Sequence, residues 1–484
     1  MESATQTLHR LTSYEAGRHW DDLPDDPRLV HDLETNDLAR LPWFVKRYDG
    51  DLPRIDLPRD LPTTKADAVA VLAGAAEVPA AEPLDLAQLG RLLYLCAGVV
   101  RTTPRTWGTF YFRAAGSAGG RFPLEAYVAV PDGGLLPPGV HWYDAMAHAL
   151  VQVGPAPAGE TPTVVVTGVP WRTGWRYRER GYRHVYWDAG TMLSQLLAAA
   201  SAAGLPAQLW SRFPDATVSA LVGADGTHEW PVALVTLGPG GPVLEPAGPA
   251  AAGAVDAVPV EFPLATAAQR AGDRTELGPP WDAGAPVPVL REAGRPIDEV
   301  VLRRGSQRLM DPNGSLPANL FRMAMTAAMR GIPHPQVAAV HAVDGLAPGT
   351  YHWPDLDLPV RTGDLRRELY HLALDQDLAS DAAFVVLSLA DLAGADDRDY
   401  RDAHLSAGLV EGRLHLLAYA MGAGASGMTF LDYEIERLVG EPLAGVLLTC
   451  VGVPEYASAP GGPPGAPTSV RSVTPRWGPE PERR

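Results

Sequence analysis

Apolar runs separated by polar breaks divide the chain into two similar stretches. Spacing of three and four residues indicates helices, and short continuous apolar runs indicate buried strands. In the first stretch this predicts helices at 84–98 and 188–204 and strands at 125–130, 163–169 and 231–238. In the second it predicts helices through 303–308, 319–331 and 407–424 and strands at 338–343, 382–389 and 445–453. The predicted fold class is therefore α+β.

The two stretches are copies of each other. Residues 180–204 match residues 398–422, and all matched pairs are 218 residues apart. The pairs are Arg180/Arg398, Tyr182/Tyr400, Arg183/Arg401, Gly190/Gly408 and Gly204/Gly422. A duplication that keeps a long helix predicts two like domains about a pseudo-twofold axis, as in a homodimer fused into one chain.

The composition along the chain sets the expected boundaries. Residues 1–60 are expected to form an extended N-terminal arm, 61–240 the first domain and 291–456 the second. Between them, 241–290 has the Pro, Gly and Ala content of a linker without regular elements. The tail at 457–484 is predicted to be disordered.

Charge and cysteine content exclude several classes of function. The formal net charge of −17 argues against binding to nucleic acid or to a membrane surface, since both favour basic patches. The two cysteines lie in apolar runs, and the histidines show no ligand-like clustering, so no metal centre and no disulfide are expected. Because the N-terminus has no apolar signal segment, a cytoplasmic protein is expected.

One segment of the second copy stands out against the acidic balance. The sequence RRGSQR places Arg303, Arg304 and Arg308 around Ser306. Guanidinium groups form charge-assisted, often bidentate hydrogen bonds with phosphate, and a serine hydroxyl adds another bond. An arginine-rich helix is, however, more often a solvated or salt-bridged surface, so the segment alone does not decide between these readings.

With two further segments, the chain resembles the azoline-dehydrogenase branch, the SagB- and McbC-like oxidases, of the FMN-dependent nitroreductase fold. The resemblance implies that the arginine segment binds the FMN phosphate and ribityl chain. It also implies contacts from GSAGG, where Gly116 replaces the family proline, and from GASG after the long helix, whose small residues allow backbone N–H groups to approach the flavin ring. The residues expected to bind are Ser117, Ala118, Gly119, Gly120, Gly424, Ala425, Ser426 and Gly427.

These segments are divided between the copies. The arginines and GASG occur only in the second copy, and GSAGG occurs only in the first. In the resembled fold each flavin lies at a dimer interface, with the arginine and late glycine segments from one subunit and the Ser-Ala-Gly segment from the other. One complete site built across both halves is therefore expected, with one FMN per chain.

The resemblance also implies a catalytic pair. The family pattern Lys-Tyr-x-Glu-Arg-Gly-Tyr-Arg aligns with 176–183, but Arg176 replaces the lysine. Arginine does not act as a base, so Tyr177 is expected to accept the proton and Arg176 to act electrostatically. The alternative is that 176–183 is a structural helix start with surface arginines.

The activity that the resemblance implies is oxidation of thiazoline or oxazoline rings to thiazoles or oxazoles in a ribosomally made peptide, with O2 as electron acceptor. The expected partners are an azoline-bearing precursor peptide and a cyclodehydratase complex, and the chain could also form a homodimer. Two alternatives stay open: an NAD(P)H-dependent nitro or enone reductase on the same fold, and a flavin-free scaffold subunit of a heterocyclase complex.

Overall fold

The computed structural model describes residues 2–19, 21–80 and 82–476, and in them the chain forms two large antiparallel sheets. The first sheet has the order β1-β6-β5-β4-β7-β9-β8. Its strands are β1 (Arg54–Asp56), β4 (Leu124–Val130), β5 (Gly139–Asp144), β6 (Ala149–Gly154), β7 (Thr163–Gly168), β8 (Ala207–Trp210) and β9 (Trp230–Leu237).

The second sheet repeats this topology. Its order is β12-β11-β10-β13-β15-β14, which is the order of the first sheet without β1. Its strands are β10 (Gln336–Val340), β11 (Gly349–His352), β12 (Arg361–Thr362), β13 (Phe384–Ala390), β14 (Gly424–Met428) and β15 (Ala444–Gly452). The predicted α+β class and the predicted pair of like domains are thus confirmed.

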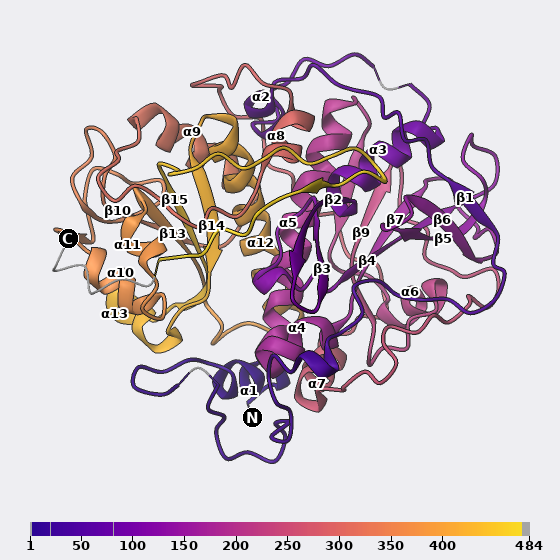
Figure 1. Ribbon diagram of the computed structural model, residues 1–484, viewed down its shortest axis with the longest axis horizontal. Helices are drawn as coiled ribbons and strands as arrows, with labels where there is room; N and C mark the ends of the chain where they lie inside the picture. The colour runs from indigo at the N-terminus through magenta and orange to yellow at the C-terminus, as the bar shows by residue number, and fades with distance from the viewer. Residues whose placement is uncertain (1, 20, 81, 477–484) are drawn as a thin grey trace.

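Two long helices, α5 (Gly181–Ala202) and α12 (Asp397–Ala420), lie between the sheets at the centre of the molecule (Figure 1). Nearly every residue of both helices is buried, as expected of helices that are covered on all sides. They meet at the repeated glycines. A Cβ atom on Gly190 would lie 2.4 Å from the backbone carbon of Gly408, so only glycine allows this approach.

The other elements surround this core. The helices, including short 3-10 turns, are α1 (Ala4–Leu11), η1 (Leu38–Arg40), α2 (Ala68–Leu72), α3 (Leu86–Ala97), η2 (Ala118–Gly120), α4 (Pro170–Tyr177), η3 (Arg178–Arg180), α6 (Asp215–Val222), α7 (Pro263–Ala271), α8 (Ile297–Arg303), α9 (Ala318–Ala328), α10 (Arg366–Leu372), α11 (Asp377–Asp381), η4 (Asp432–Glu434) and α13 (Ile435–Val439). A third, small sheet contains β2 (Val99–Arg105), β3 (Gly108–Arg113) and β16 (Thr468–Ser469). None of the helices in the described ranges is long and apolar enough to span a membrane.

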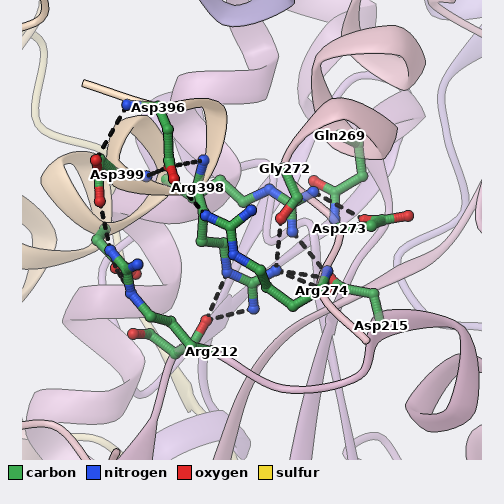
Figure 2. A network of polar contacts seen from close by, with 12 residues as sticks. Arg212, Asp215, Gln269, Gly272, Asp273, Arg274, Asp396, Arg398 and Asp399 are labelled. Atoms are coloured by element: carbon green, nitrogen blue, oxygen red, sulfur yellow. Dashed lines mark hydrogen bonds and ion pairs between the residues drawn. The ribbon is translucent and has the colours of Figure 1, made fainter. Parts of the chain in front are cut away.

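The repeated arginines join the two halves. At one side Arg398 and Arg401 of the second copy reach the first copy's Asp215, with N–O distances of 2.8 and 2.9 Å (Figure 2 shows the network around Asp215). All three side chains are almost completely buried. A buried carboxylate is tolerated because two guanidinium groups pair with it.

At the pseudo-symmetric position the roles of the copies are exchanged. Arg180 and Arg183 of the first copy reach Asp432 of the second, at 2.7 and 2.6 Å. The backbone N–H of Tyr14 also donates to Asp432, at 2.7 Å. The N-terminal arm therefore takes part in this junction. Arg180 and Arg183 have a structural role, but they are buried and not the surface arginines that the alternative reading of 176–183 expected.

The predicted helix through 303–308 is wrong. Helix α8 ends at Arg303, and Arg304 has φ −56° and ψ 134°, which is an extended conformation. The backbone N–H of Gln307 donates to the carbonyl of Ala425 in β14, at 2.9 Å. Pairing with the neighbouring strand therefore replaces helical hydrogen bonding in this segment.

Three of the expected irregular segments contain regular structure. The arm of residues 1–60 includes α1, and a capping box at Ser3 stabilises the N-terminus of this helix. The linker at 241–290 includes α7, although 239–260 has neither a helix nor a strand. The tail is ordered at least in part: β16 pairs in parallel with β2, and the Gly461 N–H donates to the Leu302 carbonyl at 2.7 Å. Its last residues, 477–484, lie outside the described ranges.

Candidate functional site

The side chains of the arginine segment point in different directions. Arg304 is 4% exposed and donates from Nη2 and Nε to the carbonyl of Ala114, at 2.7 and 3.2 Å. Arg303 lies on the surface and pairs with Glu299 at 2.9 Å. Ser306 and Arg308 are exposed. Only Arg304 therefore reaches into the interface between the two halves.

A second buried arginine lies beside Arg304. Arg101, on β2 of the first copy, donates to the carbonyls of Arg304 and Ala459, at 3.0 and 2.7 Å, and to the carbonyl of Leu302. Burial, reinforced by Arg101, lowers the pKa of Arg304 to about 10, and burial also lowers the pKa of Arg101. None of the described carboxylates lies within 4.0 Å of either guanidinium group. Two adjacent buried cations are therefore paired with carbonyl groups and not with a carboxylate, and their charge suits an anion such as phosphate.

The GSAGG segment lies on the other side of this contact. Gly119 and Gly120 have φ values of 58° and 65°, which favour glycine, so the loop is compatible with this sequence. The Ser117 hydroxyl donates to Asp188 Oδ2 at 2.5 Å, and the Ala118 N–H donates to Oδ1 at 2.9 Å. Burial raises the pKa of Asp188 well above its usual value, although these two hydrogen bonds oppose the shift.

Tyr177 and Arg176 contact the same segment at the end of α4. A Cβ atom on Gly119 would lie 2.6 Å from the Tyr177 hydroxyl and 2.8 Å from Arg176 Cδ. The Tyr177 ring packs edge-on against His184, with 4.1 Å between centroids. The exposed Arg176 donates to the Asn36 side chain at 3.1 Å and lies 5.6 Å from the Tyr177 ring centroid. The two predicted catalytic residues are thus adjacent to the predicted cofactor loop.

The GASG segment forms β14, next to the extended arginine segment. A Cβ atom on Gly424 would lie 2.9 Å from Gln307, so this glycine permits the close packing of the two segments. Ser426 is buried, whereas Gly427 is partly exposed. A Cβ atom on Gly427 would lie 2.2 Å from Oε1 of Glu411, a residue of α12.

Glu411 and His415 complete the polar lining, and neither was singled out from the sequence. Glu411 Oε1 lies 3.7 Å from His415 Nε2, and His415 Nδ1 lies 3.4 Å from Arg304 Nη1. Burial raises the pKa of Glu411 to about 7, and burial with Arg304 lowers the pKa of His415 to about 3. The repeat could have indicated them, because the equivalent residues of the first copy, 218 positions earlier, are the apolar Leu193 and Leu197.

The pseudo-symmetric position is filled by protein. A Cβ atom on Gly74, next to α2, would lie 2.8 Å from Arg330 Nη1, and Arg330 donates to the Gly284 carbonyl at 3.1 Å. Trp281 donates to the Gly331 carbonyl at 3.1 Å. Residues of the 241–290 linker therefore pack where a second site would lie, and the apolar Leu193 and Leu197 replace Glu411 and His415 on its central helix.

Of the predicted residues, Arg304 lies against Ala114 and Gly116 of the first copy, and Tyr177 and Arg176 lie against Gly119, whereas Arg303, Ser306 and Arg308 are exposed. Arg304 and β14 come from the second copy, and the GSAGG loop and Tyr177 come from the first. In the described ranges, no group of three or more His, Cys, Asp or Glu side chains is arranged to hold a metal ion. The donor set is one of arginines, backbone N–H groups and hydroxyls, which suits a phosphate-bearing organic cofactor.

Comparisons with known proteins identify the fold. No model of a protein family matches the chain. A protein of Methanocaldococcus jannaschii described as a nitroreductase is 26% identical over 204 residues, covering 39% of this chain and 98% of that protein. A solved structure from Anabaena variabilis, also described as a nitroreductase, covers 94% of this chain and 100% of its own, with 24% identity and a TM-score of 0.72.

A more distant neighbour is the E. coli microcin synthetase McbBCD complex with truncated pro-MccB17 bound, at 14% identity and a TM-score of 0.27 over 46% of this chain. The Anabaena structure shows the fold, because its match covers 94% of this chain and therefore includes both halves. The protein is a tandem of two nitroreductase-like domains, each with one long central helix; the seven-strand sheet of the first has the same order as the six-strand sheet of the second, apart from the added β1.

Proposed function

We propose that this protein is an FMN-dependent dehydrogenase that oxidises thiazoline or oxazoline rings to thiazoles or oxazoles in a ribosomally synthesised peptide, with O2 as the electron acceptor. The observation that carries the proposal is that the two halves of the chain contact each other where the predicted cofactor-binding segments lie. Arg304 of the second copy donates to Ala114, two residues before the GSAGG loop of the first, and the GASG strand lies alongside. The choice of azolines among flavin substrates rests on the sequence resemblance.

Each segment has a defined role in this proposal. Arg304, with Ser306 and Arg308 at its open side, would hold the FMN phosphate; Arg303 would join them only by leaving Glu299. The backbone N–H groups of GSAGG and GASG would contact the ring system. When bound, FMN supplies a two-electron acceptor for the hydride equivalent that leaves the azoline ring.

Tyr177 would accept the proton that leaves the ring. Its hydroxyl lies against Gly119 of the cofactor loop, so a ring held at this loop is within its reach. The guanidinium group of Arg176, close to the same ring, would stabilise negative charge on the phenol oxygen. Arg176 would thereby provide the charge that the family places on lysine, without acting as a base.

The first test is the flavin content of the purified protein. We expect flavin absorption bands and, after denaturation, one FMN per chain. Arg304→Ala should weaken FMN binding about 30- to 100-fold, the equivalent of one charge-assisted hydrogen-bonding group. Arg303→Ala is the matched control within the same segment, and it should retain the cofactor because this side chain faces solvent.

Each alternative predicts a different result. Two FMN per chain would show that the pseudo-symmetric position also binds and would contradict the single-site proposal. An absence of FMN even after its addition would favour a scaffold. With FMN bound, anaerobic bleaching by an azoline peptide would support the dehydrogenase, whereas rapid bleaching by NADPH alone would favour the reductase.

A further inference from the structure

Glu411 is an acidic side chain placed among the cofactor-site segments. Its carboxyl group lies directly against Gly427. Any side chain at this position would displace the carboxyl group, because a Cβ atom there would lie 2.2 Å from Oε1. The side chain is 14% exposed, so it is shielded from water but open at one edge. It lies one helical turn before His415, which contacts Arg304.

The groups around Glu411 do not provide a salt bridge. His415 Nε2, at 3.7 Å, has no hydrogen-bond partner among the described residues, and the low pKa of His415 keeps this ring neutral. Arg304 attracts the carboxylate from a greater distance, while Asp188 on α5 and the buried Cys450 on β15 add no positive charge. Burial is the largest influence and raises the pKa of Glu411 to about 7, against the opposing effects of Arg304 and the Gly427 N–H.

The core packing does not require an acid at this position. The equivalent residue of α5 is Leu193, and the equivalent of His415 is Leu197, both in the same helix pair. A leucine therefore meets the packing demands of this helix surface in the half that has lost its arginine segment. The acid is present only where Arg304 and GASG are also present.

We propose that Glu411 is the proton-binding residue of the cofactor site, and that FMN binds to the form in which this carboxyl group is neutral. This inference rests on the proposed function, because it presupposes that FMN binds beside Arg304. Glu411 is a positioning residue in this proposal: its charge acts from a distance on the phosphate and on Arg304 and contacts neither the ring nor the substrate.

The direction of the effect follows from the charges. An ionised Glu411 would repel the FMN phosphate and attract Arg304, so it would oppose binding. Bound FMN would correspondingly favour the neutral acid and raise its pKa further. FMN affinity should therefore fall as the pH rises above about 7, where the FMN phosphate is already fully ionised, with a limiting slope of about tenfold per pH unit for one linked proton.

The test measures the Kd of apoprotein for FMN by quenching of flavin fluorescence between pH 7 and 8.5, above the range in which the FMN phosphate titrates. We expect the affinity of the wild type to fall at least fivefold over this range, and Glu411→Gln to remove the dependence because the amide does not ionise. Glu434→Gln is the control: this acid pairs with the largely exposed Arg437 on the surface, so its variant should keep the wild-type profile. A flat wild-type profile, or an unchanged slope in Glu411→Gln, would overturn the proposal while leaving FMN binding intact.

A calorimetric measurement on the wild type does not depend on the folding of a variant. FMN binding at pH 8, titrated in two buffers of different ionisation enthalpy, should be accompanied by proton uptake, from about 0.3 up to one proton per FMN. Zero uptake would overturn the role of Glu411. If the wild type does not bind FMN at any pH, the proposed function fails, and this inference fails with it.

Discussion

The contact between the Tyr177 hydroxyl and Gly119 gives a prediction at the scale of a single residue. Tyr177→Phe should lower the rate of azole formation by about 10²- to 10⁴-fold, the usual contribution of a general base. The FMN content should not change, because the ring keeps its contact with His184. The rate is measured by mass loss of an azoline peptide, which falls by two hydrogens per ring.

The control for this substitution is Tyr433→Phe, which removes a hydroxyl from a side chain that is 52% exposed. This variant should oxidise the peptide at the wild-type rate. Unchanged azole formation by Tyr177→Phe would contradict the assignment of Tyr177, and loss of FMN together with activity would point to a role in holding the loop instead.

At the same scale, the sequence predicted residues with a recognisable pattern and missed those whose chemistry depends on burial. Arg304, Gly119 and Tyr177 were predicted from motifs; the structure places Arg304 against Ala114 and Gly116 at the start of the GSAGG loop and Tyr177 against Gly119 further along it. Asp188 and Glu411 each lie on a long apolar helix and acquire their raised pKa values only from the enclosure that the fold creates. The outward position of Arg303 was also not predictable, because it depends on where α8 ends.

At the scale of elements, the crossing of α5 and α12 depends on two glycines. Gly408→Ala would place a Cβ atom 2.3 Å from the backbone oxygen of Trp187 in α5, so the two helices would have to move apart. We expect the free energy of unfolding to fall by about 1–3 kcal/mol or more, as for other overpacked cores. Urea unfolding followed by circular dichroism measures the change.

Gly90→Ala in α3 is the matched control for this substitution. It also places alanine in a buried helix, but the nearest atoms would lie at an ordinary 3.5 Å. Because alanine favours helix more than glycine does, this variant should be neutral or more stable by about 0.5–1 kcal/mol. Equal destabilisation of both variants would show that the close approach of α5 and α12 is not the limiting contact.

The helices and strands were predicted well where a regular pattern of apolar residues extends over many positions. They were predicted poorly where backbone pairing with a distant segment decides the conformation. The core strands lie close to their predicted positions, because their apolar runs are buried on all sides. The central helices were predicted, but α5 and α12 begin at Gly181 and Asp397, well before the predicted starts at 188 and 407, because their first turns contain the buried arginines. The 304–308 segment was predicted as helix and is extended, since its N–H at Gln307 pairs with β14. Similarly, β16 forms in a Pro- and Gly-rich tail because β2 supplies the partner strand.

At the scale of the whole molecule, the buried acids Asp432 and Asp215 join the two halves. Asp432→Asn would leave Arg180 and Arg183 without their carboxylate, so we expect the unfolding free energy at pH 7 to fall by about 3–5 kcal/mol. Glu434→Gln, which removes a pair with the largely exposed Arg437, should change it by less than about 1 kcal/mol. Urea unfolding of the three proteins at pH 7 tests both expectations.

The same acid gives a pH dependence with a definite sign. The arginines lower the pKa of Asp432 to about 2, below the usual value of 3.8, despite burial. Its contribution to stability is therefore present above pH 4 and is lost as the pH falls toward 2. The stability of the wild type should decline more steeply than that of Asp432→Asn between pH 4 and 2, and parallel declines would contradict this assignment.

The fusion of two copies has a consequence for how such a protein can diverge. In a homodimer encoded by one gene, every codon change appears at both of the symmetric positions, so a substitution that suits one position must be tolerated at the other. Here Glu411 and Leu193 occupy equivalent positions on α12 and α5 but are encoded separately. Selection can therefore act on each position independently. One side of the duplicated interface is free to keep polar residues, while the other side keeps residues that serve only packing.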